Sequence, residues 1–454
     1  MDEIPPSPPP INNELESISS TPSPVIIPTE LIALILSFLP VKIISKFRCV
    51  SKSWKKLISD PSFIQMHLQK SSSLNPNFIF KPFVYEYPFN TIVSLPISRL
   101  LHNQPSITLS GHTYRNLLKD DENCFVVGSC NGLICLRFES HSTKHVNFSF
   151  RIWNPATGTI SEKLGFLREN KPILGIFKFT FGCDVLTGTY KLVWLHSVQI
   201  RGIWKTNVRV YSLGGNGDGD DKCCWRNIST RFICGDGVHL NGTITWLTLS
   251  EDLSVLGGSV KPLTPHVDFF RIASLDLSTE TFTELFHPED FNEVPCAESN
   301  LRVLLDCLCF SHDFRKTEFV IWQMKEFGVR ESWTQLFRIR YFDLQMPNVP
   351  IEVQYLDEST LMPLYVSKNG DTVILTNEED DKAIIYNQRD NRVVRTTTSN
   401  NIQWFSAIDY TESLVPTPWK PGDVEAKTKQ DEDESESEDE EEEVYGGFFF
   451  TMIN

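Results

Sequence analysis

Hydrophobic positions are densest in residues 26–68, where they follow a helical spacing. Thr29 can cap a first helix, with Pro28 fixing its entry and Pro40 stopping it. A second short helix follows Pro40, and Asp60-Pro61 is expected to close a third. The third carries apolar residues at i, i+4, i+7 and i+8, which are Val50, Trp54, Leu57 and Ile58. The pattern therefore predicts three short helices, followed by a short linker at Ser71-Ser72-Ser73.

These helices hold more apolar side chains than one buried stripe requires. Three short helices of about 40 residues cannot bury that surplus by themselves. An exposed apolar patch usually marks an interaction site. The pattern alone leaves two interpretations: the helices cap the downstream domain, or their apolar surface contacts a partner.

The same segment resembles a plant F-box. The matching residues keep their order in the runs Ile27-Pro28, Glu30-Leu31-Ile32, Ile35-Leu36, Leu39-Pro40-Val41, Phe47-Arg48-Cys49-Val50-Ser51-Lys52-Ser53-Trp54 and Ile58-Ser59-Asp60-Pro61-Ser62-Phe63. In that family the motif binds the Skp adaptor, which docks onto cullin and the ubiquitin-conjugating machinery. Carried over by position, the resemblance implies these contacting or supporting residues: Pro28, Leu31, Ile32, Ile35, Leu36, Leu39, Pro40, Val41, Ile44, Phe47, Val50 and Trp54.

From residue 75 the pattern changes to strand-sized apolar runs between turn residues. Asn-Gly, a strong hairpin signal, occurs at Asn131-Gly132, Asn241-Gly242 and Asn369-Gly370, each time before strand-like residues. A second motif consists of an apolar residue, then Asn or Asp, then a turn and another apolar residue. It starts at Trp153, Leu275 and Tyr386 and ends seven residues later each time, with weaker versions at Tyr211 and Trp322.

The five instances of this motif lie 47 to 64 residues apart. A four-stranded propeller blade takes about 40 to 50 residues, so each gap fits one blade with loop insertions. One or two further units can come from residues 75–121. The repeat therefore predicts a large all-β domain, a β-propeller of six to eight irregular blades. A pair of stacked sheets would use the same strand pattern and is the alternative.

This region resembles the plant F-box-associated domain, which is often grouped with kelch-type partners. The matching pieces are residues 128–135, 153–158, 190–193, 210–213, 240–242, 321–329 and 332–333. In that family the domain recruits the protein to be ubiquitinated. The sequence does not identify the substrate or the residues that bind it. It also does not separate an S-locus-type role from a general F-box role.

Composition completes an α+β multidomain organisation. We expect a disordered Pro-rich leader (1–24), the F-box (25–70), the F-box-associated domain (75–416) and a disordered acidic tail (418–454). Of the net charge of −16, residues 431–443 contribute 11 acidic and no basic residues, which leaves −5 for the rest. A mildly acidic body does not indicate a nucleic-acid binder. No signal peptide and no membrane-spanning run occurs, so we expect the cytoplasm, the nucleus or both, with no membrane partner.

No motif for catalysis, metal or cofactor stands out. The 11 cysteines include no Cys-x-x-Cys pair and are expected to be free thiols in a reducing compartment. The chain has no phosphate-binding loop, nucleophile elbow or zinc-protease helix. We therefore interpret it as a non-catalytic adaptor of a Skp–cullin–F-box ubiquitin ligase. The alternatives are a propeller-fold hydrolase, or a binding protein outside any ligase, with the helices as packing.

Overall fold

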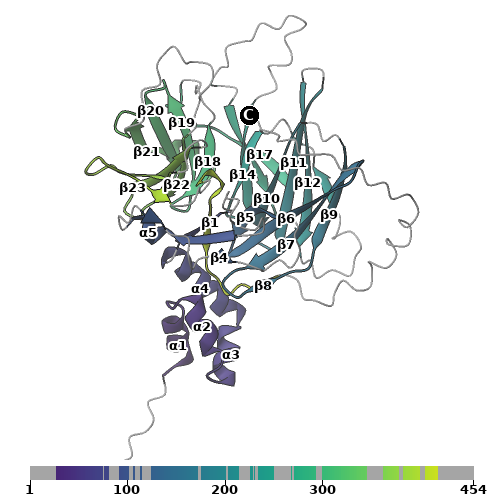
Figure 1. Ribbon diagram of the computed structural model, residues 1–454, viewed down its shortest axis with the longest axis vertical. Coiled ribbons are helices and arrows are strands. Elements are labelled where there is room, and N and C mark those ends of the chain that lie inside the picture. The colour runs from purple at the N-terminus through teal and green to yellow at the C-terminus, as the bar shows by residue number, and fades with distance from the viewer. Residues whose placement is uncertain are drawn as a thin grey trace, which may run out of the picture.

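The computed structural model describes residues 27–417, with internal gaps at 75, 81–91, 102–105, 108–112, 115–123, 172–174, 201–202, 214–224, 229, 231–233, 250–266, 268–269, 293–298, 345–360, 378–381 and 399–403. The predicted leader and acidic tail lie outside the described residues. A head of helices lies at one end of a ring of β-sheets (Figure 1).

The head contains four helices, where the sequence pattern predicted three: α1 (Thr29–Leu36), α2 (Val41–Phe47), α3 (Lys52–Ile58) and α4 (Pro61–Leu74). Asp60-Pro61 does follow the end of α3, but it also starts α4. The backbone N–H of Ser62 donates to Asp60 Oδ1 at 2.9 Å, and proline is tolerated at a first helical position. The linker predicted at Ser71–Ser73 was wrong because α4 continues through it. The Thr29 cap was also wrong: Pro28 precedes α1, with no side-chain cap.

Six of the seven sheets among the described strands are arranged as propeller blades, which confirms the predicted propeller at the low end of its range. From the innermost strand outward, blade 1 has β27 (Ile408–Thr411), β1 (Pro76–Phe80), β2 (Ile92–Pro96) and β4 (Thr113–Tyr114). Blade 2 has β5 (Cys124–Cys130), β6 (Leu133–His141), β7 (His145–Asn154) and β8 (Thr159–Ile160), with β9 (Leu164–Asn170) also on β7. Blade 3 has β10 (Ile176–Cys183), β11 (Tyr190–Ile200), β12 (Ile203–Leu213) and β13 (Arg226–Ile228).

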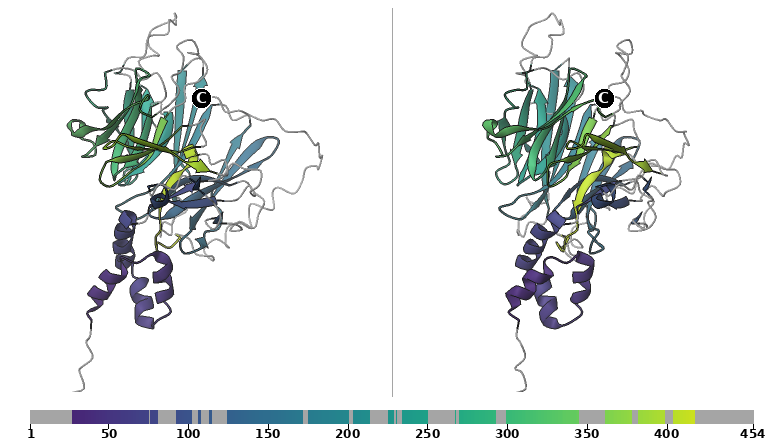
Figure 2. Two further views of the ribbon diagram at one scale, coloured as in Figure 1. Left: turned by 60° about the vertical axis from the view of Figure 1, so that its left-hand side comes forward. Right: turned by 90° about the vertical axis from the view of Figure 1, so that its left-hand side faces the viewer.

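Blade 4 has β14 (Cys234–Leu240), β15 (Thr243–Leu249), β16 (Phe270–Asp276) and β17 (Thr281–Leu285). Blade 5 has β18 (Asn300–Leu304), β19 (Cys307–Phe314), β20 (Glu318–Met324) and β21 (Trp333–Arg340), and blade 6 has β22 (Leu361–Val366), β23 (Thr372–Asn377), β24 (Ile384–Asn387) and β25 (Arg392–Arg395). Outside the blades, β3 (Ser106–Ile107) pairs with β26 (Thr397–Thr398), and the short helices are α5 (Ile97–Leu101), Arg330–Ser332 and Trp404–Ser406. Figure 2 shows the ring from two further sides.

The two sequence motifs are the turns of these blades. Asn131-Gly132 and Asn241-Gly242 take positive φ at both residues and join the first two strands of blades 2 and 4. The second motif joins the last two strands of a blade, and its apolar ends are register partners in all three strong instances: Trp153 with Ile160, Leu275 with Phe282, and Tyr386 with Val393. Its polar residue caps the turn; in blade 4, Asp276 Oδ1 accepts from the backbone N–H groups of Ser278 and Thr279.

The last strand of the described residues closes the ring. β27 pairs with β1, so residues 329 to 335 positions apart complete blade 1. The four residues after β27, 412–415, form a C-terminal strap between ring and head. Asn154 Nδ2 donates to the carbonyl oxygens of Ser413 (3.1 Å) and Val415 (2.7 Å), and Ser413 Oγ donates to the carbonyl of Asn131 (2.8 Å). A Cβ on Gly132 would collide with Ser413, so only glycine fits this approach.

The strap also seats the head. Leu414 is buried in the core of the head, beside side chains of α1, α2 and α4. Ala156, in the last turn of blade 2, packs on the same core. Ile64 and Leu68 of α4 pack against the core between blades 2 and 3. Ring and head therefore share apolar contacts on one face of the propeller.

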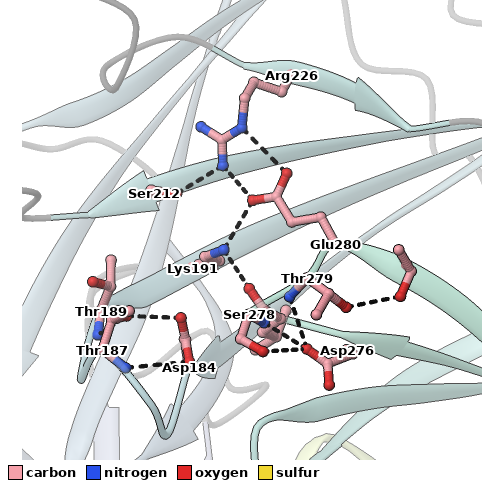
Figure 3. A network of polar contacts seen from close by, with 12 residues as sticks. Asp184, Thr187, Thr189, Lys191, Ser212, Arg226, Asp276, Ser278, Thr279 and Glu280 are labelled. Atoms are coloured by element: carbon pink, nitrogen blue, oxygen red, sulfur yellow. Dashed lines mark hydrogen bonds and ion pairs between the residues drawn. The ribbon is translucent and has the colours of Figure 1, made fainter. Parts of the chain in front are cut away.

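An ion-pair network joins blades 3 and 4 (Figure 3). Lys191 Nζ of β11 contacts Glu280 Oε1 at 2.8 Å and donates to the carbonyl of Leu277, and Arg226 of β13 binds the same carboxylate. Burial raises the pKa of Glu280, but the hydrogen bonds from Arg226 and Lys191 outweigh it, so the pKa is lowered overall. The carboxylate therefore stays charged at neutral pH and links neighbouring blades.

Asn154→Ala tests the strap. The side chain is fully buried and makes four hydrogen bonds, two of them to the strap. Removing them leaves buried carbonyl and N–H groups unpaired, so we expect a loss of about 3 kcal/mol in the free energy of unfolding. Asn387→Ala is the matched control, since Asn387 lies at the same point of blade 6 without strap contacts. It should cost about 1 kcal/mol. Urea unfolding measures both; equal losses would contradict the role of the strap.

Candidate functional site

One side of α1 presents an apolar stripe to solvent. Leu31, Leu34, Ile35 and Phe38 are 50%, 42%, 60% and 50% exposed. They follow an i, i+3, i+4, i+7 spacing, which places them on one side of the helix. Ile27, before the helix, is exposed to a similar degree.

The opposite side of the head is closed. Leu36, Val41 and Ile44 are at most 2% exposed, and they pack with Ile58, Phe63 and Leu414. The head therefore has its own core, completed by the strap, and the stripe of α1 is left over. Covering the exposed half of four such side chains would contribute about 4 kcal/mol, at about 1 kcal/mol each. A surface of that size favours a partner.

A second concave site lies inside the ring. The innermost strands line a channel with a cavity of about 550 Å³. Lys178 of β10 and Asp236 of β14 form an ion pair of 2.9 Å there, and Arg302 of β18 and Asp409 of β27 also line it. Within the described part of the chain, no group of three or more His, Cys, Asp or Glu side chains could hold a metal ion.

The two longest connections between strands begin and end on the same face of the ring. Short connections occur on both faces: 131–132, 241–242 and 305–306 on the face toward the head are two residues long, and 142–144 and 315–317 on the opposite face are three. On the opposite face, residues 250–269 and 341–360 connect strands through 20 residues each. The channel mouth on that far face lies at the first residues of the inner strands, since Asp236 and Lys178 are 78% and 42% exposed there.

Two family patterns match the two parts of this molecule. The pattern described as "F-box domain" matches residues 26–66. The pattern described as "F-box associated beta propeller domain" matches residues 84–417, more than half of the chain. The chain belongs to the F-box-associated β-propeller family.

This F-box protein is similar along most of its length to plant relatives. An F-box/kelch-repeat protein of Arabidopsis thaliana is 28% identical over 334 residues, which cover 70% of this chain and 80% of the relative. The F-box protein CPR1 of the same plant is 26% identical over 365 residues, 77% of this chain and 79% of the relative. No helix among the described residues is long and apolar enough to cross a membrane.

The residues assigned by resemblance to Skp-adaptor docking fall into three groups. Those exposed on the F-box surface are Pro28, Leu31, Ile35, Pro40 and Val50; those half-buried are Ile32, Leu39, Phe47 and Trp54; those buried in the core are Leu36, Val41 and Ile44. The first group can contact a partner directly, whereas the last can only support the fold of the head. Docking itself stays a prediction for all of them.

Sequence reasoning missed exposed apolar residues of the F-box: Ile27, Leu34, Phe38 and Ile43. The signal was present, because Leu34 and Phe38 continue the helical spacing of Leu31 and Ile35. The ammonium of Lys70 lies over the ring of Phe38, 5.2 Å from the ring centroid. These side chains widen the candidate docking surface.

A buried histidine joins α4 to the turn after α1. His67 is 1% exposed, and its Nε2 lies 2.9 Å from the carbonyl oxygen of Leu39. A carbonyl only accepts, so Nε2–H is the donor. Nδ1 is buried and has no hydrogen-bond partner among the described residues. Burial lowers the pKa of His67, against a smaller raising effect of the Leu39 hydrogen bond.

This histidine makes the stability of the F-box head depend on pH. Its folded pKa is below the ordinary value of 6.5, so the unfolded head binds the proton first. The stabilisation is complete above pH 6.5 and falls as the pH drops below it. Hydrogen-exchange protection of α4, corrected for intrinsic exchange rates, should therefore decrease as the pH is lowered below 6.5, by at most about tenfold per pH unit. His67→Gln should remove this dependence; an unchanged profile in the variant would refute the assignment.

Proposed function

We propose that this F-box protein is the substrate-recognition adaptor of a Skp–cullin–F-box ubiquitin ligase. The α1 stripe docks the Skp adaptor, and through it cullin, while the propeller binds the protein to be ubiquitinated. The observation that supports this most directly is the exposed stripe Leu31, Leu34, Ile35 and Phe38 on a head whose other side is already packed. A partner of matching apolar surface would complete it.

In such a complex the role of this chain is to hold the target protein in place. Holding a target near a charged ubiquitin-conjugating enzyme turns a bimolecular encounter into an intramolecular one, which raises the rate without chemistry by the adaptor. F-box proteins are typically non-catalytic adaptors of this kind. We propose the cytoplasm, the nucleus or both as its location.

We propose the far face of the ring, opposite the head, for substrate recruitment. The two longest connections between strands, 250–269 and 341–360, join strand ends on that face. Binding residues usually lie on loops held by a rigid scaffold. A target on the far face would also leave the α1 stripe free for the Skp adaptor.

The alternatives are a propeller hydrolase and a binding protein outside any ligase. For the hydrolase, Cys130 Sγ and His239 Nδ1 lie 3.7 Å apart beside the channel, as a nucleophile and a base would. A hydrogen bond with Cys183 and then burial raise the pKa of Cys130 well above its usual value. A buried, protonated thiol is a poor nucleophile, which favours the adaptor.

Leu31→Asp tests the docking role. The side chain is half exposed, so the charge leaves the core of the head in place but would be buried by the Skp adaptor. We expect the affinity for a purified plant Skp adaptor to fall by about 2 kcal/mol or more, roughly 30-fold. Isothermal calorimetry measures this directly. Leu36 is unsuitable, because it is 2% exposed and a charge there would unfold the head.

Leu186→Asp is the matched control. Leu186 is 84% exposed in the turn between β10 and β11, and it receives the same substitution in the propeller instead of on α1. It should bind the Skp adaptor like the unmodified chain. If Leu31→Asp also bound normally, the stripe would not be the docking surface. That result would leave a binding protein outside any ligase as the better account.

A further inference from the structure

The central channel has the size of a ligand site. Its cavity of about 550 Å³ falls within the roughly 300–1,000 Å³ of small-molecule pockets. Every inner strand of the ring contributes to its wall. The mouth, marked by Lys178 and Asp236, opens on the face opposite the head.

Two charged side chains in this channel are not used by the fold. The Arg302 guanidinium makes one hydrogen bond to the described residues, from Nη2 to the sulfur of Met362 at 2.7 Å. A thioether is a weak acceptor, and a guanidinium can bind a carboxylate through two parallel bonds. Across the described residues, no side chain hydrogen-bonds to the Asp409 carboxylate, which water reaches inside the channel. The ion pairs among these residues do not include one between Arg302 and Asp409.

Both groups lie inside the ring, where Arg302 is half-buried and Asp409 is exposed to the channel. Burial lowers the pKa of Arg302, and the carboxylates of Asp236 and Asp409 oppose that effect. Burial raises the pKa of Asp409, and the charge of Arg302 opposes it. The two groups therefore sense each other through the cavity without touching.

The charges also define which ligand fits. Lys178 and Arg302 are positive, and Asp236 and Asp409 are negative, so the four cancel. Arg137, also in the wall, is neutralised by Glu139 at 2.6 Å. Burial lowers the pKa of His239, which favours its neutral form. A simple anion or cation would satisfy only one of the two free groups, whereas a dipolar ligand would satisfy both.

We propose that the channel binds a small zwitterion, with its carboxylate on Arg302 and its ammonium on Asp409. The ligand class is that of an α-amino acid. This site is separate from the α1 stripe and does not depend on Skp-adaptor docking. A ligand there would sit beneath the far face, where it can alter the surface that a target meets.

The test uses the full chain and the standard amino acids at millimolar concentration, each assayed by thermal shift and then by calorimetry. We expect at least one to bind. Its N-acetyl derivative and its methyl ester each remove one charge, and each should bind at least about tenfold more weakly. Binding by none of the amino acids, or binding of either derivative as tight as that of the free amino acid, would overturn the proposal.

Channel variants locate the binding. Arg302→Gln and Asp409→Asn should each weaken the best amino acid about tenfold or more. Arg340→Gln is the control, because Arg340 is an exposed arginine paired with Asp343 outside the channel. Asp409 is partly solvated, so we expect Asp409→Asn to fold. This variant can therefore test the site even if Arg302→Gln does not fold. Unweakened binding by a folded channel variant would contradict the assignment.

A protein whose first residue is acidic carries the same two charges, an α-ammonium and a side-chain carboxylate. A pentapeptide amide that starts with glutamate separates this source from free amino acids. Tighter binding of the peptide would place the channel in the substrate surface. Tighter binding of the free amino acid would make the ligand a small molecule.

Discussion

The pairing of β27 with β1 closes the ring and joins the two ends of the propeller segment of the chain. β27 completes blade 1 as its innermost strand, so the ring exists only when the C-terminal end of the fold is in place. The strap after it then reaches Asn154 and places Leu414 in the core of the head. Residues 408–415 therefore take part both in closing the ring and in seating the head.

This arrangement fixes the position of the head relative to the ring. The head is attached through α4, Ala156 and Leu414 rather than through a single flexible link. The α1 stripe points away from that attachment, and the channel mouth lies on the opposite face of the ring. In the proposed complex, a target bound at the mouth and the Skp adaptor bound at the stripe would be held at a fixed separation. A fixed separation is what a rate gain from proximity requires.

Local patterns made much of the fold predictable. The seven-residue spacing of Trp153 and Ile160 predicts that they pair across two strands, because the capped four-residue turn between the strands fixes their register. Leu305-Asp306 forms a two-residue turn with positive φ at both residues, like the Asn-Gly turns. It contains no glycine, so the sequence carries no turn signal there. The fourth helix was missed because proline at Asp60-Pro61 can start a helix as well as end one. Arg302 and Asp409 are over 100 residues apart, and only the closed ring places them in one cavity.

The most direct test is a cryo-electron microscopy structure of the full chain bound to a plant Skp adaptor. The account predicts adaptor density over Leu31 and Ile35, with the strap still in the head core and the channel mouth uncovered. Adaptor density on the ring, or a head detached from Leu414, would contradict it.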